Sequence, residues 1–213
     1  MIKHPPKPKG REAITVWNRN KILKASIEVI AKHGIAGMTI TRVVDLANVA
    51  RGLINKYFQS KDILLMESLK FMAAEYSAYM KKAYQKAGSS PSEQIKAIIR
   101  TDFNPKVLNQ KNMGIWFAYR SLVRSKPEYL PYVETRETEF TNLLISLCKA
   151  LNKEGNYNLR VNLIVLGLEA MLEGMWLDFN LHPRNYNRKE AIETCFLYLG
   201  RMFPNHYHDF VRK

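Results

Sequence analysis

A short basic stretch near the N-terminus combines the residue types that bind DNA. Arg51, Gly52, Asn55 and Lys56 fall on one side of a two-turn helix expected at 51–57. Its apolar side consists of Leu53, Ile54 and Phe58. Arginine reads guanine and asparagine reads adenine in the major groove, whereas lysine more often contacts phosphate. The pattern predicts a helix with one face in the protein core and the other available to DNA.

Aromatic and acidic side chains further along the chain suggest a second kind of site. Glu169 and Glu173 are four residues apart on an otherwise apolar helical segment, so they share a face. Trp116, Phe117 and Trp176 could add aromatic faces, and such faces with a carboxylate bind quaternary ammonium groups. Ordinary core packing of the aromatic rings, with Arg120 or Arg124 as partners of the two glutamates, is the alternative.

Catalytic and metal-binding patterns are missing from the sequence. The five histidines have no neighbouring nucleophile or paired carboxylates, and no glycine-rich phosphate loop occurs. Cys148 and Cys195 lie among apolar residues and are expected to be reduced core thiols. We therefore expect neither an enzyme nor a bound metal or cofactor.

The net charge favours a polyanionic partner, either nucleic acid or an anionic membrane surface. It is +14 overall, and residues 1–61 hold 12 Lys and Arg against three acidic residues, whereas residues 62–213 hold 21 against 16. Residues 1–10, rich in Pro and Lys, are expected to form a mobile basic arm. No apolar run suits a signal peptide or a membrane span, so the expected location is the cytoplasm, with no membrane partner.

Helical spacing of apolar residues recurs along the chain, and alternating strand patterns are scarce, so an all-α fold is expected. Gly34 should stop the first helix, Thr39 or Thr41 should cap the second, and Pro91 should begin the fifth. The expected helices cover about 17–32, a short segment after Thr39, 51–57, 61–86, 91–103, 112–125, 128–152, 158–181 and 187–202.

The N-terminal motif resembles the TetR family of bacterial repressors. The resemblance rests on Gly34, Thr39, Val43-Val44, the turn Ala47-Asn48-Val49-Ala50, Arg51-Gly52, Tyr57-Phe58 and Lys61-Asp62. Two positions depart from the family pattern, because Asn48 replaces the usual glycine and Ala50 replaces the usual serine. Asparagine tolerates a left-handed turn, whereas loss of the serine removes a helix cap.

This resemblance implies an N-terminal helix-turn-helix domain at 1–61 and a helical ligand-binding and dimerisation domain at 62–213. It also implies that Arg42 faces the groove with the third helix and that Thr39, Thr41, Tyr57 and Lys61 contact the DNA backbone. The last two helices are expected to form a homodimer. Candidate contacts there, which could equally be intramolecular core, are Leu166, Ala170, Ile192, Phe196 and Leu199.

Further motifs are similar to the choline-responsive repressors of glycine betaine synthesis within this family. They are Thr39-Ile40-Thr41-Arg42, Gly52–Phe58, Gly114-Ile115-Trp116-Phe117-Ala118 and Leu172-Glu173-Gly174-Met175-Trp176-Leu177. The resemblance implies a repressor that a small cationic effector, choline or a relative of it, releases from a palindromic operator. A ligand-independent regulator of the same fold, an activator, and a non-specific nucleic-acid-binding protein remain alternatives.

Overall fold

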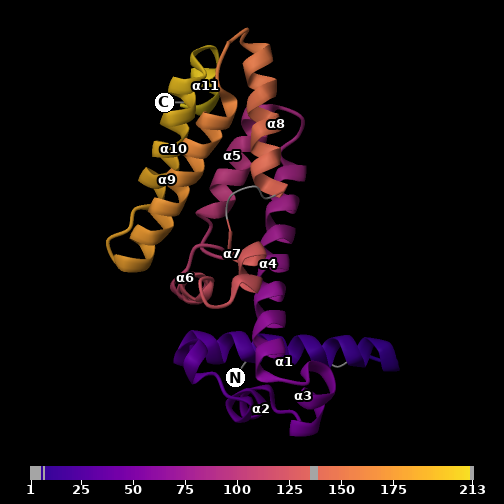
Figure 1. Ribbon diagram of the computed structural model, residues 1–213. Helices are drawn as coiled ribbons and strands as arrows, with labels where there is room; N and C mark the ends of the chain where they lie inside the picture. Colours follow the sequence, from indigo (N-terminus) through magenta and orange to yellow (C-terminus); the bar gives the residue numbers. More distant parts are fainter. Residues whose placement is uncertain (1–5, 7, 135–138, 212–213) are drawn as a thin grey trace. The chain divides into compact units, whose positions relative to one another are not determined.

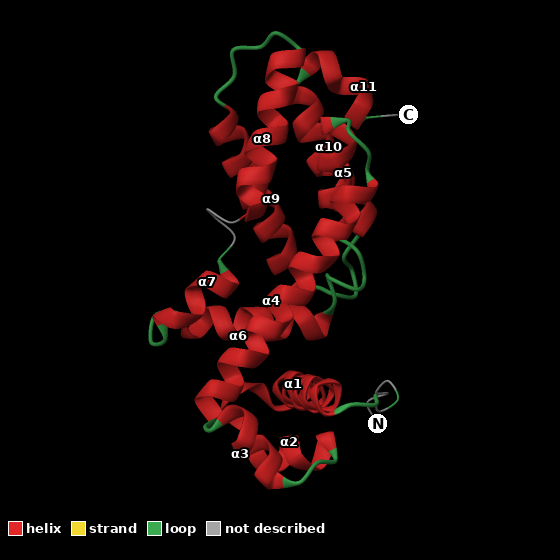
Figure 2. Cartoon of the chain, turned by 90° about the vertical axis from the view of Figure 1, so that its right-hand side faces the viewer, coloured by secondary structure: helices red, strands yellow, loops and turns green. Residues whose placement is uncertain are grey.

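The computed structural model describes residues 6, 8–134 and 139–211, and every regular element in these ranges is a helix (Figures 1 and 2). The expected all-α fold is confirmed. None of the helices in these ranges is long and apolar enough to cross a membrane. The expected basic arm lies largely outside the described residues. The chain divides into two compact units, residues 1–75 with 114–133, and residues 76–113 with 134–213.

The first unit begins with α1 (Arg11–Gly37), α2 (Ile40–Ala47), α3 (Arg51–Phe58) and the first part of α4 (Lys61–Lys86). Two sequence signals for their ends are confirmed, whereas the expected start of the first helix at about residue 17 is wrong, because α1 already begins at Arg11. Gly34 has a φ of 69°, which interrupts the helical backbone of α1 three residues before its end, and Thr39 caps α2. The first unit also contains most of α6 (Gln110–Leu122), a 3-10 turn η1 (Pro127–Tyr129) and α7 (Leu130–Val133).

One apolar core joins these elements. It contains Ile22 and Leu23 from α1, Val43 from α2, Ile54 and Phe58 from α3, Leu64, Leu65 and Leu69 from α4, and Ile115 and Tyr119 from α6. The buried Tyr119 hydroxyl donates a hydrogen bond to the Leu65 carbonyl at 2.8 Å, and the Tyr119 ring meets Tyr129 edge to face. The core therefore extends beyond the expected DNA-binding segment 1–61 and fixes the start of α4 to it.

The second unit is built on a ring of four helices. α5 (Pro91–Asp102) packs on α8 (Glu139–Glu154), α8 on α9 (Val161–Leu181), α9 on α10 (Arg188–Met202), and α10 on α5. α9 and α10 approach closely at Gly167, where a side chain would meet the Tyr198 hydroxyl, which donates to the Ile164 carbonyl at 3.0 Å. The short α11 (Tyr207–Phe210) packs on α5 and α10.

The expected helix at 128–152 is wrong in its first part. The structure places η1 and α7 there, and α8 begins only at Glu139. Pro131 lies in the first turn of α7, where its missing amide hydrogen is not needed, so a new short helix starts at that point. Residues 135–138, which the expected helix also covered, lie outside the described residues.

Candidate DNA-binding surface and effector site

The turn between α2 and α3 has the geometry that the sequence predicts. The Thr39 hydroxyl accepts a hydrogen bond from the Arg42 amide at 3.3 Å, which caps α2. Asn48 adopts a left-handed conformation with a φ of 47°, so asparagine replaces glycine there without breaking the turn. Val49 packs partly buried against the first-unit core. Ala50 provides no side-chain cap for α3, as its residue type predicts.

α3 has one buried face and one exposed face. Ile54 and Phe58 are buried, and Leu53 is half-buried. Arg51, Gly52, Asn55 and Lys56 are exposed, and Tyr57 is half-buried with its ring edge against Phe58. A side chain at Gly52 would meet open space, so the fold itself does not require glycine there. This face offers hydrogen-bond donors and a small residue where another molecule can approach closely.

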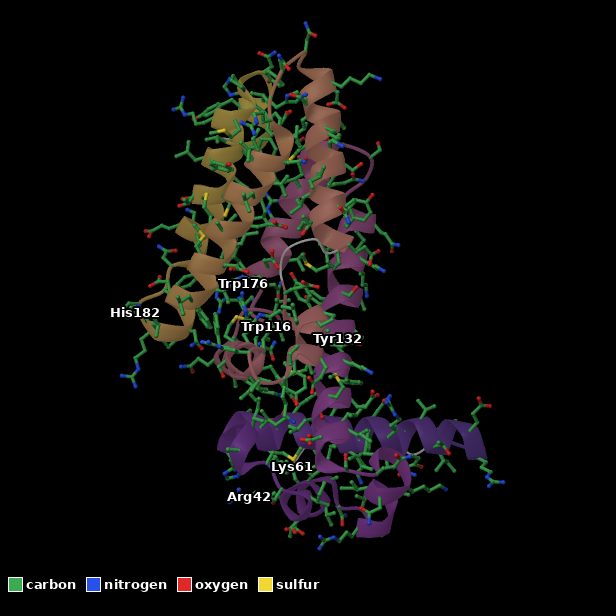
Figure 3. All side chains as sticks on the ribbon, in the orientation of Figure 1. Arg42, Lys61, Trp116, Tyr132, Trp176 and His182 are labelled. Atoms are coloured by element: carbon green, nitrogen blue, oxygen red, sulfur yellow. The ribbon has the colours of Figure 1, made fainter. Side chains whose placement is uncertain are left out.

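Two of the expected DNA contacts also hold the end of α1. The Arg42 guanidinium donates to the Gly37 carbonyl, and the Lys61 ammonium donates to the Ala36 carbonyl at 3.5 Å (Figure 3). Both side chains are exposed, as is Thr41. Cations are favourable beside the last carbonyls of a helix, so Arg42 and Lys61 stabilise this corner before any DNA binds.

One basic residue that supports the turn, Lys21, has no pattern in the sequence that singled it out. The Lys21 ammonium donates to the Asn48 carbonyl at 3.3 Å and lies 5.1 Å from the centre of the Trp17 ring. The four-residue spacing of Trp17 and Lys21 on one helix could have indicated their contact. The contact with Asn48 is long-range and had no such signal.

The structure distributes the five expected effector residues over both units. Trp116 and Phe117 are half-buried on α6 in the first unit, where Trp116 packs against the core. Glu169, Glu173 and Trp176 lie on α9 in the second unit. Glu169 accepts a hydrogen bond from the Thr141 hydroxyl of α8 at 2.6 Å, and both glutamates are half-buried.

Trp176, labelled on α9 in Figure 3, is buried. Only 6% of its surface is exposed, and its indole N–H has no hydrogen-bond partner within the described part of the chain. The Tyr186 hydroxyl, in the loop before α10, is likewise buried without a partner there. Unpaired buried donors are costly, which makes both groups candidates for contact with a bound molecule.

The most unusual carboxylate of the second unit is Asp102, which the sequence pattern did not single out. It ends α5, is 3% exposed, and accepts a hydrogen bond from the Tyr76 hydroxyl of α4 at 2.7 Å. Burial raises the pKa of Asp102 to about 7, and the hydrogen bond from Tyr76 opposes this rise. Burial also raises the pKa of Tyr76.

A surface cavity of about 890 Å³ also lies in the second unit, between α5 and α10. Two arginines of its lining already have partners within the protein. Arg100 lies over the Phe196 ring, and Arg188 donates to the carbonyls of Phe103 and Leu108. The acidic residues of its lining on α10, Glu190 and Glu193, are exposed. This cavity does not match the expected site of aromatic rings around a carboxylate.

The two cysteines are buried core thiols with no disulfide, as expected. Burial raises the pKa of both thiols to about 12. Groups of His, Cys, Asp and Glu suited to a metal ion do not occur in the described residues.

Comparison with known proteins agrees with this geometry. Residues 22–67 match the profile of the bacterial regulatory proteins of the tetR family, and residues 91–204 match the C-terminal domain of BetI-type transcriptional repressors. The chain is 24% identical over 191 residues to an HTH-type transcriptional regulator BetI from Stenotrophomonas maltophilia, covering 90% of this chain and 94% of that protein.

Solved structures share the fold. A putative transcriptional regulator from Pseudomonas aeruginosa superposes with a TM-score of 0.77 at 21% identity, covering 91% of this chain and 93% of that one. A putative regulator from Saccharomonospora viridis, solved in complex with choline, gives a TM-score of 0.72 at 14% identity, covering 83% of this chain and 92% of that one.

The helix-turn-helix surface and these matches define a DNA-binding transcriptional regulator, and its function is regulation of transcription and not catalysis. The C-terminal profile spans more than half of the chain. The chain therefore belongs to the TetR family and carries the C-terminal domain of the BetI-type repressors.

Proposed function

We propose that this protein is a homodimeric repressor that binds a palindromic operator and is released by a small organic cation, with choline as the first candidate. The observation that supports DNA binding is that α3 has one exposed polar face and one buried apolar face. The contacts that we assign to DNA are Thr39, Thr41, Arg42, Arg51, Gly52, Asn55, Lys56, Tyr57 and Lys61. A bacterial regulator of chromosomal DNA acts in the cytoplasm, which is the location we propose.

An apolar stripe on α9 supports a dimer through the last two helices. Its exposed members recur every three or four residues and are Leu163, Leu166, Ala170, Gly174, Leu177 and Leu181. Leu197 of α10 is also exposed, whereas Phe196 and Leu199 are buried within their own unit and Ile192 is half-buried. A side chain at Gly174 would meet open space, so a second helix can approach there closely. An exposed apolar face of this kind is typical of an interface.

The proposed effector class rests on three observations. The structurally similar regulator from Saccharomonospora viridis holds choline. The BetI-type profile covers the C-terminal domain. The second unit contains buried aromatic rings and acidic groups of the kinds that bind a quaternary ammonium ion. Glu169, Glu173, Trp176, Trp116 and Phe117 remain candidates for this contact.

Selection of bound fragments from random-sequence DNA tests the DNA-binding part. Two recognition helices of a dimer enter successive major grooves about 34–36 Å apart, so the selected sites should contain inverted repeats of matching spacing. Binding should also show a stoichiometry of two subunits per site. Binding without sequence preference, with a steep dependence on salt alone, would instead support a non-specific nucleic-acid-binding protein.

A further inference from the structure

Asp102 and Lys96 are the two charged side chains that the structure buries within its described ranges. Lys96 forms an ion pair with Glu93 and donates to the Asp209 carbonyl. Asp102 has no ion-pair partner in the described part of the chain, and its hydrogen bond comes from the neutral hydroxyl of Tyr76. The two buried charges therefore differ, because among the described residues Lys96 has a counter-ion and Asp102 has none.

The position of Asp102 makes its negative charge still less favourable. It is the last residue of α5, and the C-terminal end of a helix carries partial negative charge. A buried carboxylate in such a place is costly unless a cation compensates it. The fold thus holds an acidic group whose charged form requires a positive partner that the described residues do not provide.

Tyr76, which donates to Asp102, brings an aromatic side chain to the carboxylate. The Tyr76 ring meets Phe140 of α8 edge to face, with centroids 6.1 Å apart, and Phe103 is buried next to Asp102 in sequence. The negative charge of Asp102 contributes to the raised pKa of Cys195 on α10, so the carboxylate lies near that helix. The Cys195 thiol in turn contacts the Met175 sulfur of α9 at 3.9 Å.

Three other charged groups on these helices have partners of their own. Glu169 of α9 accepts from Thr141 of α8, and Arg188 of α10 donates to the carbonyls of Phe103 and Leu108 and lies 4.8 Å from the centre of the Phe179 ring. Arg100 of α5 lies over Phe196. The structure shows two groups that interact with Asp102, namely Tyr76 of α4 through its hydrogen bond and Cys195 of α10 through charge.

We propose that Asp102 is the anionic anchor of the effector site and that it binds the positive head of a quaternary ammonium compound. This assignment rests on the proposed function and replaces Glu169 with Asp102 as the principal charge partner. The Trp176 N–H and the Tyr186 hydroxyl, buried in the same unit and without a partner among the residues that the structure describes, suit an oxygen atom on the same ligand. An amino alcohol such as choline combines both features.

The same contact offers a route to regulation. Tyr76 belongs to α4, which begins at Lys61, three residues after the end of α3, and continues into the second unit. A cation at Asp102 changes the environment of the Tyr76–Asp102 hydrogen bond and therefore acts on α4 directly. A ligand that favours a different position of α4 shifts the population of DNA-binding dimers.

The first test uses the wild-type protein and choline chloride, with tetramethylammonium chloride as a second probe. Because the cation binds the ionised carboxylate, and the pKa of Asp102 is about 7, the dissociation constant should be about tenfold larger at pH 6 than at pH 8. Calorimetry near pH 6.5 in two buffers should show proton release on binding. The neutral alcohol in which carbon replaces the choline nitrogen should not compete. Affinity that does not change with pH, or equal affinity for the neutral alcohol, would overturn the assignment.

The second test compares Asp102→Asn with Asp45→Asn, the same chemical change at an exposed carboxylate of α2. Asp102→Asn should weaken choline binding by about tenfold or more, and Asp45→Asn should bind choline as the wild type does. Tyr76→Phe, which keeps the ring, should alter the choline concentration that releases operator DNA. If Asp102→Asn does not fold, as judged by circular dichroism, the wild-type pH series decides.

These outcomes separate the two proposals. If choline releases the operator equally well from wild-type protein and Asp102→Asn, the anchor is elsewhere and the proposed function stands. If the wild type binds neither cation but still selects an operator, both the anchor and the cationic effector are wrong, and the DNA-binding role remains.

Discussion

Replacing Asp102 by Asn should stabilise the free protein, and the gain should depend on pH. The pKa of this carboxyl is raised from 3.8 to about 7 in the folded chain because burial disfavours its charged form. A raised pKa means that the folded state binds more protons than the unfolded state between these two values. The free energy of unfolding of the wild type therefore falls as pH rises from about 4 to about 7, and stays at the lower level above that.

The size of the effect follows from the same two values. The difference between 3.8 and about 7 corresponds to about 4 kcal/mol at most. Asparagine carries no charge and its oxygen can still accept the hydrogen bond from Tyr76, so the variant avoids most of this cost. We expect Asp102→Asn to be more stable than the wild type by about 2–4 kcal/mol above pH 8, and to differ little near pH 4.

Urea denaturation at several pH values between about 5 and 8.5 measures this difference. Asp45→Asn is the control, because it makes the same chemical change at an exposed carboxylate. Choline should reduce the gap at high pH by stabilising the wild type selectively. The stability difference could instead be constant across the pH range, or Asp102→Asn could be less stable throughout. Either result would contradict the conclusion that the buried charge of Asp102 lowers the stability of the wild type at high pH.

Three further substitutions test the DNA surface, the dimer and the first-unit core. Arg51→Ala should weaken operator binding by about tenfold to a hundredfold in a fluorescence-anisotropy titration while helicity is kept, because a base contact worth about 1–3 kcal/mol is lost; unchanged affinity would remove Arg51 from the contacts. Leu177→Glu should shift the dimer toward monomers in sedimentation velocity, because it would bury an unpaired charge in an apolar interface; a dimer as tight as the wild type would place the interface elsewhere. Tyr119→Phe should lower the free energy of unfolding by about 1 kcal/mol, since the hydrogen bond to the Leu65 carbonyl at 2.8 Å is lost. A urea midpoint equal to that of the wild type would contradict this value.

The DNA-binding unit could be predicted closely because its signals are local. Gly34, Thr39 and Asn48 each prescribe the backbone at their own position, and the structure shows an interruption, a cap and a left-handed turn there. The two faces of α3 follow from helical periodicity alone. The extension of this core to α6 could not be read in the same way, because the contact of Tyr119 with Leu65 joins residues 54 positions apart.

The proposed effector site was harder to predict for the same physical reason. The sequence pattern indicated Glu169 and Glu173 because they share a helix face. In the structure, however, Glu169 accepts a hydrogen bond from Thr141 of another helix. Asp102 and Tyr76 are 26 residues apart on different helices, and neither has a local pattern that marks it. Their burial is a property of the helix ring, and no spacing in the sequence reveals it.

The proposed function is tested most directly by titrating the purified protein with DNA from upstream of its own gene, at fixed salt, with and without choline. It predicts binding of two subunits to a specific site and a loss of that binding as choline is added. Specific binding that choline does not affect would contradict the proposed effector, and the role as a sequence-specific regulator would remain. Failure to prefer this DNA or other genomic fragments over random DNA would contradict sequence-specific repression itself.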